Sequence, residues 1–113
     1  MHEMSIVQAL IEQCKKIAKK NKAKKILRVD VKIGVLSGIE PHFFQTTFDT
    51  FKEGTICDGA KLNMNIQKIL ITCNDCNTQN TLDQNHFICP KCNSENIRVI
   101  DGEDMMLMQL EME

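Results

Sequence analysis

The sequence of 113 residues contains neither tryptophan nor tyrosine, and its aromatic residues are five phenylalanines. Side chains that could stack on nucleotide bases are therefore scarce. Basic residues are not in excess either, because 14 Lys and Arg stand against 15 Asp and Glu, which gives a net charge of −1. This balance provides no general field that would attract nucleic acid. We therefore expect no nucleic-acid partner.

Long hydrophobic segments are also missing, since no unbroken apolar run exceeds a few residues. A membrane span needs roughly 20 such residues, so we expect no membrane partner. The segment from Met1 to Ser5 lacks the basic region and apolar run of a signal peptide. No Ser-His-Asp set, Gly-rich phosphate loop or paired carboxylates stands out. We therefore predict that the protein is not an enzyme and has no catalytic residue.

Four of the six cysteines form two Cys-x-x-Cys pairs, Cys73/Cys76 and Cys89/Cys92, with twelve residues between the pairs. Thiolate is a soft, anionic ligand, and four thiolates in tetrahedral geometry suit Zn²⁺ above the other common metals. Disulfides and a redox-active dithiol are the competing interpretations, and two matched pairs favour the metal. We therefore predict a structural Zn(II) site at these four residues.

The segment that carries these pairs has little apolar material of its own. Between Cys73 and Cys92 its large apolar residues are Leu82, Phe87 and Ile88. Structural zinc supplies roughly 10–16 kcal/mol to small units of this kind, which can replace the missing apolar burial. Metal-type cysteine pairs also fit a reducing compartment better than a disulfide scaffold does, so we expect a cytoplasmic protein.

Hydrophobic periodicity predicts two helices in the first half of the chain. The first covers about residues 6–21, with Ser5 as its candidate N-cap and Cys14 as a buried thiol on its apolar face. The second begins at Pro41 and is closed by Gly54. An aromatic stripe at helical spacing gives the second helix a core-facing side, formed by Phe43, Phe44, Thr47, Phe48 and Phe51.

Alternating apolar residues predict three sheet strands, near residues 25–34, 60–68 and 104–112. In the last strand Met106, Met108, Leu110 and Met112 share one face. Because this strand follows the cysteine pairs, the segment between is an insertion. We predict an α+β fold, with a small mixed three-stranded sheet, two helices and an inserted zinc-ribbon module. The predicted domains are residues 1–68, completed by a strand at 102–113, and a zinc-binding module at 69–101.

The start of the chain is chemically unusual because His2 follows Met1 directly. The Met1 amine, the His2 amide nitrogen and the His2 imidazole can close two fused chelate rings. The Glu3 amide can complete a square-planar nitrogen set, and that geometry selects Ni²⁺ or Cu²⁺ over Zn²⁺. A histidine at this position is more commonly a flexible surface residue, so the residues alone leave both interpretations open.

In combination, these features resemble the HypA family, the nickel metallochaperones of NiFe-hydrogenase maturation. The resemblance rests on the opening Met1-His2-Glu3, on the strand Val-Asp-Val-Lys-Ile-Gly, and on paired Cys-x-x-Cys motifs ahead of an apolar tail. It covers essentially the whole chain. It implies a carrier that binds transferable Ni(II) through Met1, His2 and Glu3 and holds structural Zn(II) at the four cysteines. Residues 1–68 would then be the nickel-binding α/β domain.

The resemblance implies partners as well as ligands. The family delivers nickel to the hydrogenase large-subunit precursor together with a GTPase, HypB, and in some bacteria it also serves urease maturation proteins. This chain departs from some relatives, which carry a histidine just after a Cys-x-x-Cys pair where Asn77 and Asn93 stand here. The nearby His86, like His42, is interpreted as a surface residue.

Two other functions stay open on the sequence alone. The runner-up is a zinc-ribbon module that binds nucleic acid or a protein partner, and the third is a thiol-disulfide oxidoreductase. Seven lysines between Lys15 and Lys25 are interpreted as a solvated helix face, with docking to an acidic partner as a secondary option. Cys57 is interpreted as structural.

Overall fold

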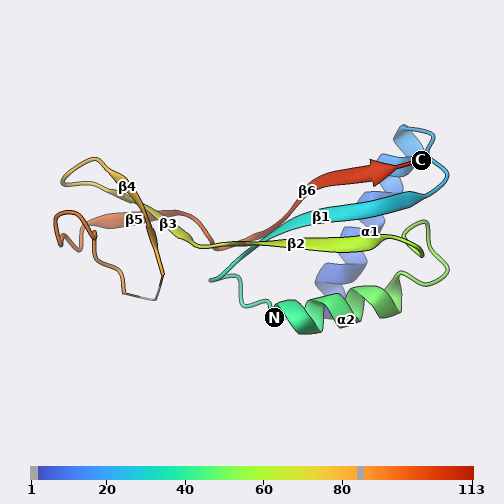
Figure 1. Ribbon diagram of the computed structural model, residues 1–113, viewed down its shortest axis with the longest axis horizontal. Helices are drawn as coiled ribbons and strands as arrows, with labels where there is room; N and C mark the ends of the chain where they lie inside the picture. The colour runs from blue at the N-terminus through green and yellow to red at the C-terminus, as the bar shows by residue number, and fades with distance from the viewer. Residues whose placement is uncertain (1–2, 84–85) are drawn as a thin grey trace.

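The computed structural model describes residues 3–83 and 86–113 as an elongated molecule of 52 × 26 × 17 Å, with two small sheets toward opposite ends (Figure 1). The helices are α1 (Glu3–Lys20) and α2 (Pro41–Phe51). The strands are β1 (Ile26–Gly34), β2 (Lys61–Gln67), β3 (Ile69–Cys73), β4 (Gln79–Leu82), β5 (Ile97–Asp101) and β6 (Met105–Met112). Across the described residues, no helix is long and apolar enough to span a bilayer.

The first sheet has the strand order β2-β1-β6. β1 pairs in parallel with β2 and antiparallel with β6, so the sheet is mixed. A parallel pair needs a crossover connection, and α2 lies in that connection. The second sheet, β4-β3-β5, is inserted between β2 and β6 and carries the cysteines. The predicted α+β class, with three sheet strands, two helices and an inserted cysteine-bearing unit, is therefore confirmed.

The main core lies between the first sheet and the two helices. The central strand contributes Val29, Val31 and Ile33, each at most 1% exposed. Figure 1 shows α1 passing behind this sheet and α2 running beside β2. Among the residues that the structure describes, fifteen buried ones form one continuous cluster here, drawn from both helices, from β1 and β2, and from the segments next to them. This half of the molecule is thus held by apolar burial.

The two helices differ from their predictions in detail. α1 begins at Glu3, so Ser5 lies inside its first turn and is not the N-cap that the sequence suggested. α2 does begin at Pro41, and the Glu40 carboxylate caps it by accepting a hydrogen bond from the Phe43 N–H. The aromatic stripe is only partly buried: Phe44 and Phe48 are fully buried, whereas Phe43 is 55% exposed. The buried face of α2 is formed by Phe44, Thr47 and Phe48, and Phe43, in the first turn, lies outside it.

The tail strand β6 does not present a single alternating face, contrary to the prediction. Its register with β1 shifts between the pairs Asp30↔Gln109 and Val31↔Leu107, which leaves Met108 as an extra residue. Such a bulge reverses which side successive residues face. As a result Met106 and Met108 are 50% and 53% exposed. The core instead receives Met105, Leu107, Leu110 and Met112.

The second sheet has very little interior. Its buried apolar cluster contains Ile69, Ile71 and Leu82, with Leu36, Ile97 and Val99 packed at its edge. β3 pairs antiparallel with β4 and with β5. The sequence did not predict β4, because its residues Gln79–Leu82 are mostly polar and show no apolar alternation. Three apolar side chains cannot by themselves hold a three-stranded sheet.

A junction joins the two halves, formed by residues 34–36, 67–69 and 101–104. The Leu36 N–H donates to the Gly102 carbonyl at 2.8 Å, and the Gly34 N–H donates to the Asp104 carbonyl at 2.9 Å. The Lys32 ammonium lies 2.8 Å from the Asp101 carboxylate. A Cβ atom on Gly34 would overlap the carbonyl of Gly102, so the two backbones touch directly. The two sheets are therefore connected by strands that cross in direct backbone contact, and not by a flexible linker.

Candidate metal centre

The first cysteine turn, residues 73–78, starts where β3 ends. The Asn77 N–H donates to the Cys73 carbonyl at 3.0 Å, and the Cys73 N–H donates to the Thr78 carbonyl at 2.9 Å. The Cys76 N–H points at the Cys73 sulfur, 3.5 Å away. Asn77 closes the turn with φ +59°, a left-handed conformation that asparagine adopts more readily than most residues. We call this turn the first knuckle.

The second cysteine turn, residues 89–94, repeats the same backbone design. The Asn93 N–H donates to the Cys89 carbonyl at 2.8 Å, and the Cys89 N–H donates to the Ser94 carbonyl at 2.9 Å. Asn93 has φ +61°, matching Asn77 in the first knuckle. This second knuckle therefore uses asparagine for the same conformational reason. The two asparagines are turn-forming residues in this structure.

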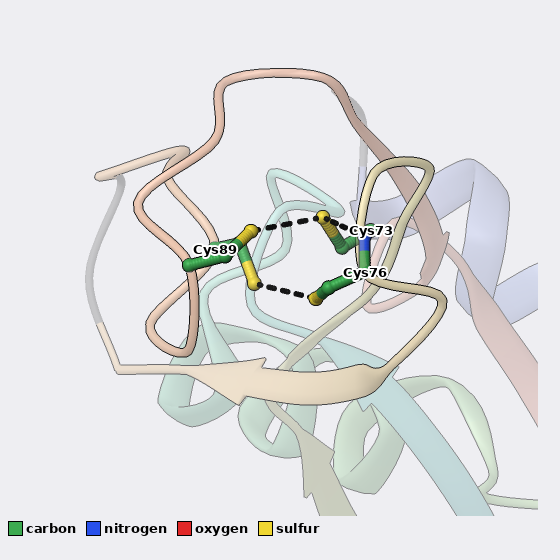
Figure 2. A group of neighbouring side chains, drawn as sticks. Cys73, Cys76 and Cys89 are labelled. Carbon is green, nitrogen blue, oxygen red and sulfur yellow. Dashed lines mark hydrogen bonds between the residues drawn. The ribbon is translucent and has the colours of Figure 1, made fainter.

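The two knuckles face each other and bring the four predicted cysteines together. All four Sγ atoms lie within 4.8 Å of one another. The sulfurs of Cys73 and Cys92 are 3.5 Å apart, and those of Cys76 and Cys89 are 3.7 Å apart. Figure 2 shows the sulfur atoms of the two turns pointing into a common space. A tetrahedral ion with metal–sulfur bonds of about 2.3 Å requires sulfur separations of about 3.8 Å, so the arrangement fits one four-coordinate ion.

The polar surroundings favour thiolate at two of these residues. Burial opposes ionisation of Cys89, but hydrogen bonds from the backbone of Cys92 and Lys91 outweigh it and lower its pKa to about 6. A hydrogen bond with the Thr78 hydroxyl, whose oxygen lies 3.0 Å from the sulfur, is the main reason that the pKa of Cys76 is lowered. Thiolate, not thiol, binds metal, so these contacts prepare the cluster for a cation.

Cys92 behaves in the opposite way. The Ser94 backbone N–H favours its thiolate, but sulfur contacts led by the one with Cys73 prevail and raise its pKa to about 12. Thiolates this close repel one another, so they cannot all be charged without a compensating ion. A divalent cation at the centre of the cluster would supply that compensation.

Polar contacts, not apolar packing, hold the knuckles to each other. The Ser94 hydroxyl donates to Asp75, and the Asn96 side-chain amide donates to the same carboxylate at 3.2 Å. These two hydrogen bonds, with that from Ser94 the larger, lower the pKa of Asp75. Across the same gap, the Asn74 backbone N–H donates to the Asn96 carbonyl at 2.9 Å. The metal centre therefore sits in a hydrogen-bonded frame.

Two supporting residues were missed by the sequence reasoning. Thr78 contacts the Cys76 sulfur, and the Asn80 side-chain amide donates to the Thr78 hydroxyl at 3.1 Å. The same amide lies 3.9 Å from the Cys89 sulfur. Both residues belong to the polar stretch that forms β4 or leads into it, where no apolar pattern marked a strand. In the sequence, the only sign that either residue supports the cysteines is that Thr78 lies two residues after Cys76.

The predicted nickel residues are described only in part. Met1 and His2 lie outside the described residues, and Glu3 is the half-buried first residue of α1. The two other histidines, His42 and His86, are exposed, as expected. His86 lines a hollow of about 360 Å³ beside the second knuckle, together with Asp83 and Pro90. Within residues 3–83 and 86–113, the four cysteines form the one cluster of metal-binding side chains.

The other two cysteines, Cys14 and Cys57, are fully buried in the main core, as the sequence suggested. They lie in the half of the molecule formed by α1, α2 and the first sheet, away from the four-cysteine cluster beside the second sheet. No role in the metal centre follows from their position.

Comparisons with known proteins agree with this architecture. Residues 1–112 match the family model described as HypA, hydrogenase/urease nickel incorporation, metallochaperone. A hydrogenase maturation factor HypA from Shewanella baltica is 58% identical, over 100% of this chain and 97% of that protein. The HypA of Aquifex aeolicus is 46% identical, over 100% of this chain and 98% of that protein.

Solved structures show the same fold. The solution structure of the nickel metallochaperone HypA from Helicobacter pylori has a TM-score of 0.73 and 38% identity, and covers 99% of this chain and 97% of that chain. A second HypA solution structure has a TM-score of 0.77 and 38% identity, with coverages of 99% and 96%. Members of this family are maturation factors and not enzymes. The chain therefore belongs to the HypA family of metallochaperones for nickel incorporation into hydrogenase and urease.

Proposed function

We propose that this protein binds Ni(II) at its N-terminus, through Met1, His2 and Glu3, and delivers it for NiFe-hydrogenase maturation. The observation that carries this proposal is the family match over residues 1–112, which begins at the chelating motif itself. The presence of His2 directly after Met1 supplies the chemistry, because an amine, an amide nitrogen and an imidazole then form adjacent chelate rings.

The start of α1 supports the role of Glu3. Backbone N–H groups in the first turn of a helix have no acceptor within the helix. The Glu3 amide can therefore lose its proton to a metal without breaking a helical hydrogen bond. Square-planar nitrogen coordination selects Ni²⁺ over Zn²⁺. Since the amide must be deprotonated, nickel affinity falls as pH falls.

The second metal in the proposal is structural Zn(II) at Cys73, Cys76, Cys89 and Cys92. Sulfur separations of 3.5 and 3.7 Å match tetrahedral thiolate coordination, which zinc favours. Four protein ligands leave no open position, so the ion stabilises the fold and is not passed on. We accordingly treat residues 69–101 as a zinc-binding module, and residues 1–68 with 102–113 as the nickel-binding domain.

The two sites have different accessibility, which suits their proposed tasks. A donor must let the acceptor's ligands reach the ion before its own ligands leave, and a chain terminus permits such an attack. In the zinc site, Cys73 and Cys89 are fully buried and Cys76 is half-buried, whereas Cys92 is exposed. The proposed recipients, carried over from the family, are the GTPase HypB and the hydrogenase large-subunit precursor, with urease maturation proteins as further partners. We place this exchange in the cytoplasm.

The junction offers a route for coupling between the two sites. Leu36, just after β1, donates its N–H to Gly102 and packs its side chain against the second sheet. A change in the zinc module would therefore reach β1 and the core that holds α1. Unchanged nickel affinity in a folded variant with altered zinc ligation would argue against this coupling.

The test is a nickel titration of zinc-loaded protein with its native N-terminus. The variants are His2→Ala and, as a matched control, His42→Ala, which removes an exposed histidine at the start of α2. We expect wild type and His42→Ala to bind about one nickel per chain, and His2→Ala to lose it while retaining about one zinc.

Two outcomes would contradict the proposal. If His2→Ala binds nickel like wild type, another donor set holds the ion. If wild type binds no nickel although it is folded and zinc-loaded, the zinc-ribbon interaction module becomes the better description. Salt-dependent nucleic-acid binding that does not require His2 would support that alternative.

A further inference from the structure

Strand β6 forms one edge of the first sheet, since the strand order is β2-β1-β6. Figure 1 shows it as the outermost strand on the side where the chain ends. Within the described residues, β6 pairs with β1 alone, and none of the backbone hydrogen bonds outside that ladder involves a residue from Met105 to Met112. The N–H and C=O groups of a strand point alternately to its two sides, so β6 presents an unpaired row of them.

A groove of about 260 Å³ runs beside this edge, between β6 and α1. The side chains that line it are mainly apolar, namely Ile17, Leu107, Met108, Leu110 and Met112, with Gln13 and Gln109. Met108 and Gln109 also line a hollow of about 240 Å³ on the opposite face of the sheet, next to Asp30 and Lys32. The edge of β6 can therefore be reached from both faces of the sheet.

Lysines border the groove on its helix side. Residues three and four apart along a helix are neighbours on its surface. Lys16 follows Gln13 by three residues, and Lys20 follows Ile17 by three, so both lysines flank the part of α1 that lines the groove. Both are exposed, and within the described residues neither forms an ion pair. The groove thus combines an apolar floor, a free strand edge and a positively charged border.

We propose that this groove is a docking site for an extended segment of a partner protein that carries apolar side chains next to acidic ones. The segment adds a strand to the free edge of β6, which supplies its backbone hydrogen bonds. On the side of α1, its apolar side chains enter the groove beside Ile17. Its carboxylates meet the ammonium groups of Lys16 and Lys20.

The charges and the lining favour this occupant over two others. A second copy of β6 is also apolar, but its Glu111 and Glu113 carboxylates already pair with Arg28 and Lys25. Nucleic acid is unsuitable because the side chains that line the groove include no aromatic ring on which a base could stack. A partner segment with carboxylates of its own supplies what both of these lack.

The proposal does not depend on the proposed nickel function. Glu3 begins α1, and at about 1.5 Å per residue it lies roughly 21 Å from Ile17 along the helix axis. The four cysteines belong to the other half of the molecule, beside the second sheet. Loss of nickel binding and loss of docking can therefore be measured separately.

The test uses nickel-free, zinc-loaded wild-type protein and a blocked synthetic peptide, Glu-Asp-Val-Thr-Val-Thr-Val-Asp-Glu. When this peptide is extended, its valines and its terminal glutamates share one face. In an NMR titration we expect chemical-shift changes at Gln13, at Ile17 and along β6, with slower hydrogen exchange for the β6 amides that face away from β1. The same peptide with Gln and Asn in place of Glu and Asp should bind roughly 3- to 10-fold more weakly.

Two double variants separate the border of the groove from the net charge of the protein. Lys16→Glu with Lys20→Glu should weaken binding of the acidic peptide roughly 3- to 10-fold. Lys61→Glu with Arg98→Glu is the matched control, because it changes the net charge equally at exposed residues of β2 and β5. At physiological salt this control should stay within about twofold of wild type.

Several outcomes would overturn the proposal. The peptide could leave wild type unchanged or perturb another surface, such as β2, or the two double variants could weaken binding equally. Dimerisation through β6 without peptide, measured by sedimentation, would make a second copy the occupant. Tighter binding of a single-stranded oligonucleotide at the same residues would assign the groove to nucleic acid. The central titration uses wild-type protein, so a variant that fails to fold does not affect it.

Discussion

The two halves of this molecule are stabilised by different means. The half that contains α1, α2 and the first sheet buries a cluster of fifteen residues, whereas the second sheet buries a cluster of three. The second sheet instead has four converging sulfurs and a frame of hydrogen bonds between asparagine, aspartate and serine side chains. One continuous fold can thus combine apolar burial in one half with a four-cysteine site of the kind that binds metal in the other.

Removal of the proposed metal should have the largest effect on the difference between the two halves. With Zn(II) bound at the four cysteines as proposed, its chelation, or Cys89→Ala, should remove a contribution of roughly 10–16 kcal/mol from a sheet with almost no core. We expect β3, β4 and β5 to lose amide protection while α1, α2 and the first sheet keep theirs. Hydrogen exchange followed residue by residue measures both halves in one sample. Loss of protection in both halves together would mean that the first half depends on the metal as well.

The converse change targets the apolar core. Phe48→Ala removes a fully buried ring from α2 and should lower the free energy of unfolding by about 3–5 kcal/mol. Phe43→Ala, on the same helix but 55% exposed, should change it by less than about 0.5 kcal/mol. Denaturant unfolding of the zinc-loaded proteins gives both values. Similar losses for the two variants would refute the burial assigned to this helix.

A smaller effect is expected at the junction, which both halves share. Gly34→Ala places a methyl group against the Gly102 carbonyl and should cost about 1–3 kcal/mol through backbone displacement. Gly59→Ala is the matched control, because no atom lies within 4 Å of its added Cβ, and should shift stability by less than about 1 kcal/mol. Chemical shifts should change in both sheets for Gly34→Ala. Changes confined to one sheet would show that the crossing does not link them.

The smallest effect concerns the ion pair across the junction. A hydrogen bond from Lys32 is the main cause that lowers the pKa of Asp101 below the ordinary value of an aspartate carboxyl group. A depressed carboxyl pKa gives stability that is present above the unfolded value and is lost as pH falls through the folded value. Asp101→Asn should therefore be less stable than wild type by a constant amount over about pH 6 to 8.

The pKa of Asp101, measured at low pH, gives a more specific test of this ion pair. In Lys32→Met the Asp101 pKa, followed by NMR titration, should rise toward the ordinary value of an aspartate carboxyl group. Zinc content must be followed in parallel, because thiolate ligation also weakens in acid. An Asp101 pKa that does not respond to the loss of Lys32 would remove the ion pair from the description of the junction.

The sequence predicted the parts of the fold that repeat a simple pattern. β1 alternates cleanly and lies where expected, as do both helices to within a few residues. The four cysteines were assigned from spacing alone, because the knuckle geometry follows from Cys-x-x-Cys and a residue tolerant of positive φ. In these places local sequence and tertiary structure agree.

The failures have identifiable physical causes. In β6 the alternation Met106, Met108, Leu110 is real in the sequence, but the bulge at Met108 changes its phase halfway along the strand. Nothing local to the strand signals this, because the register is set by pairing with β1. β4 was not predicted because its residues are mostly polar. They form a strand through pairing with β3 and through contacts around the cysteine sulfurs. Both errors concern strands whose register or existence depends on pairing with a neighbouring strand.

The contact between Gly34 and Gly102 has a consequence for protein engineering. Since the strands cross backbone to backbone, and Gly102 also lies against Lys68, the chain enters β3 and leaves β5 where it contacts the first sheet closely. A different metal-binding loop could replace the segment from β3 to β5 only if its two ends followed the same backbone course through the junction. Its interior could vary widely, whereas its two attachment points could not. The residues within this segment could therefore be exchanged, whereas its connections to the first sheet must be kept.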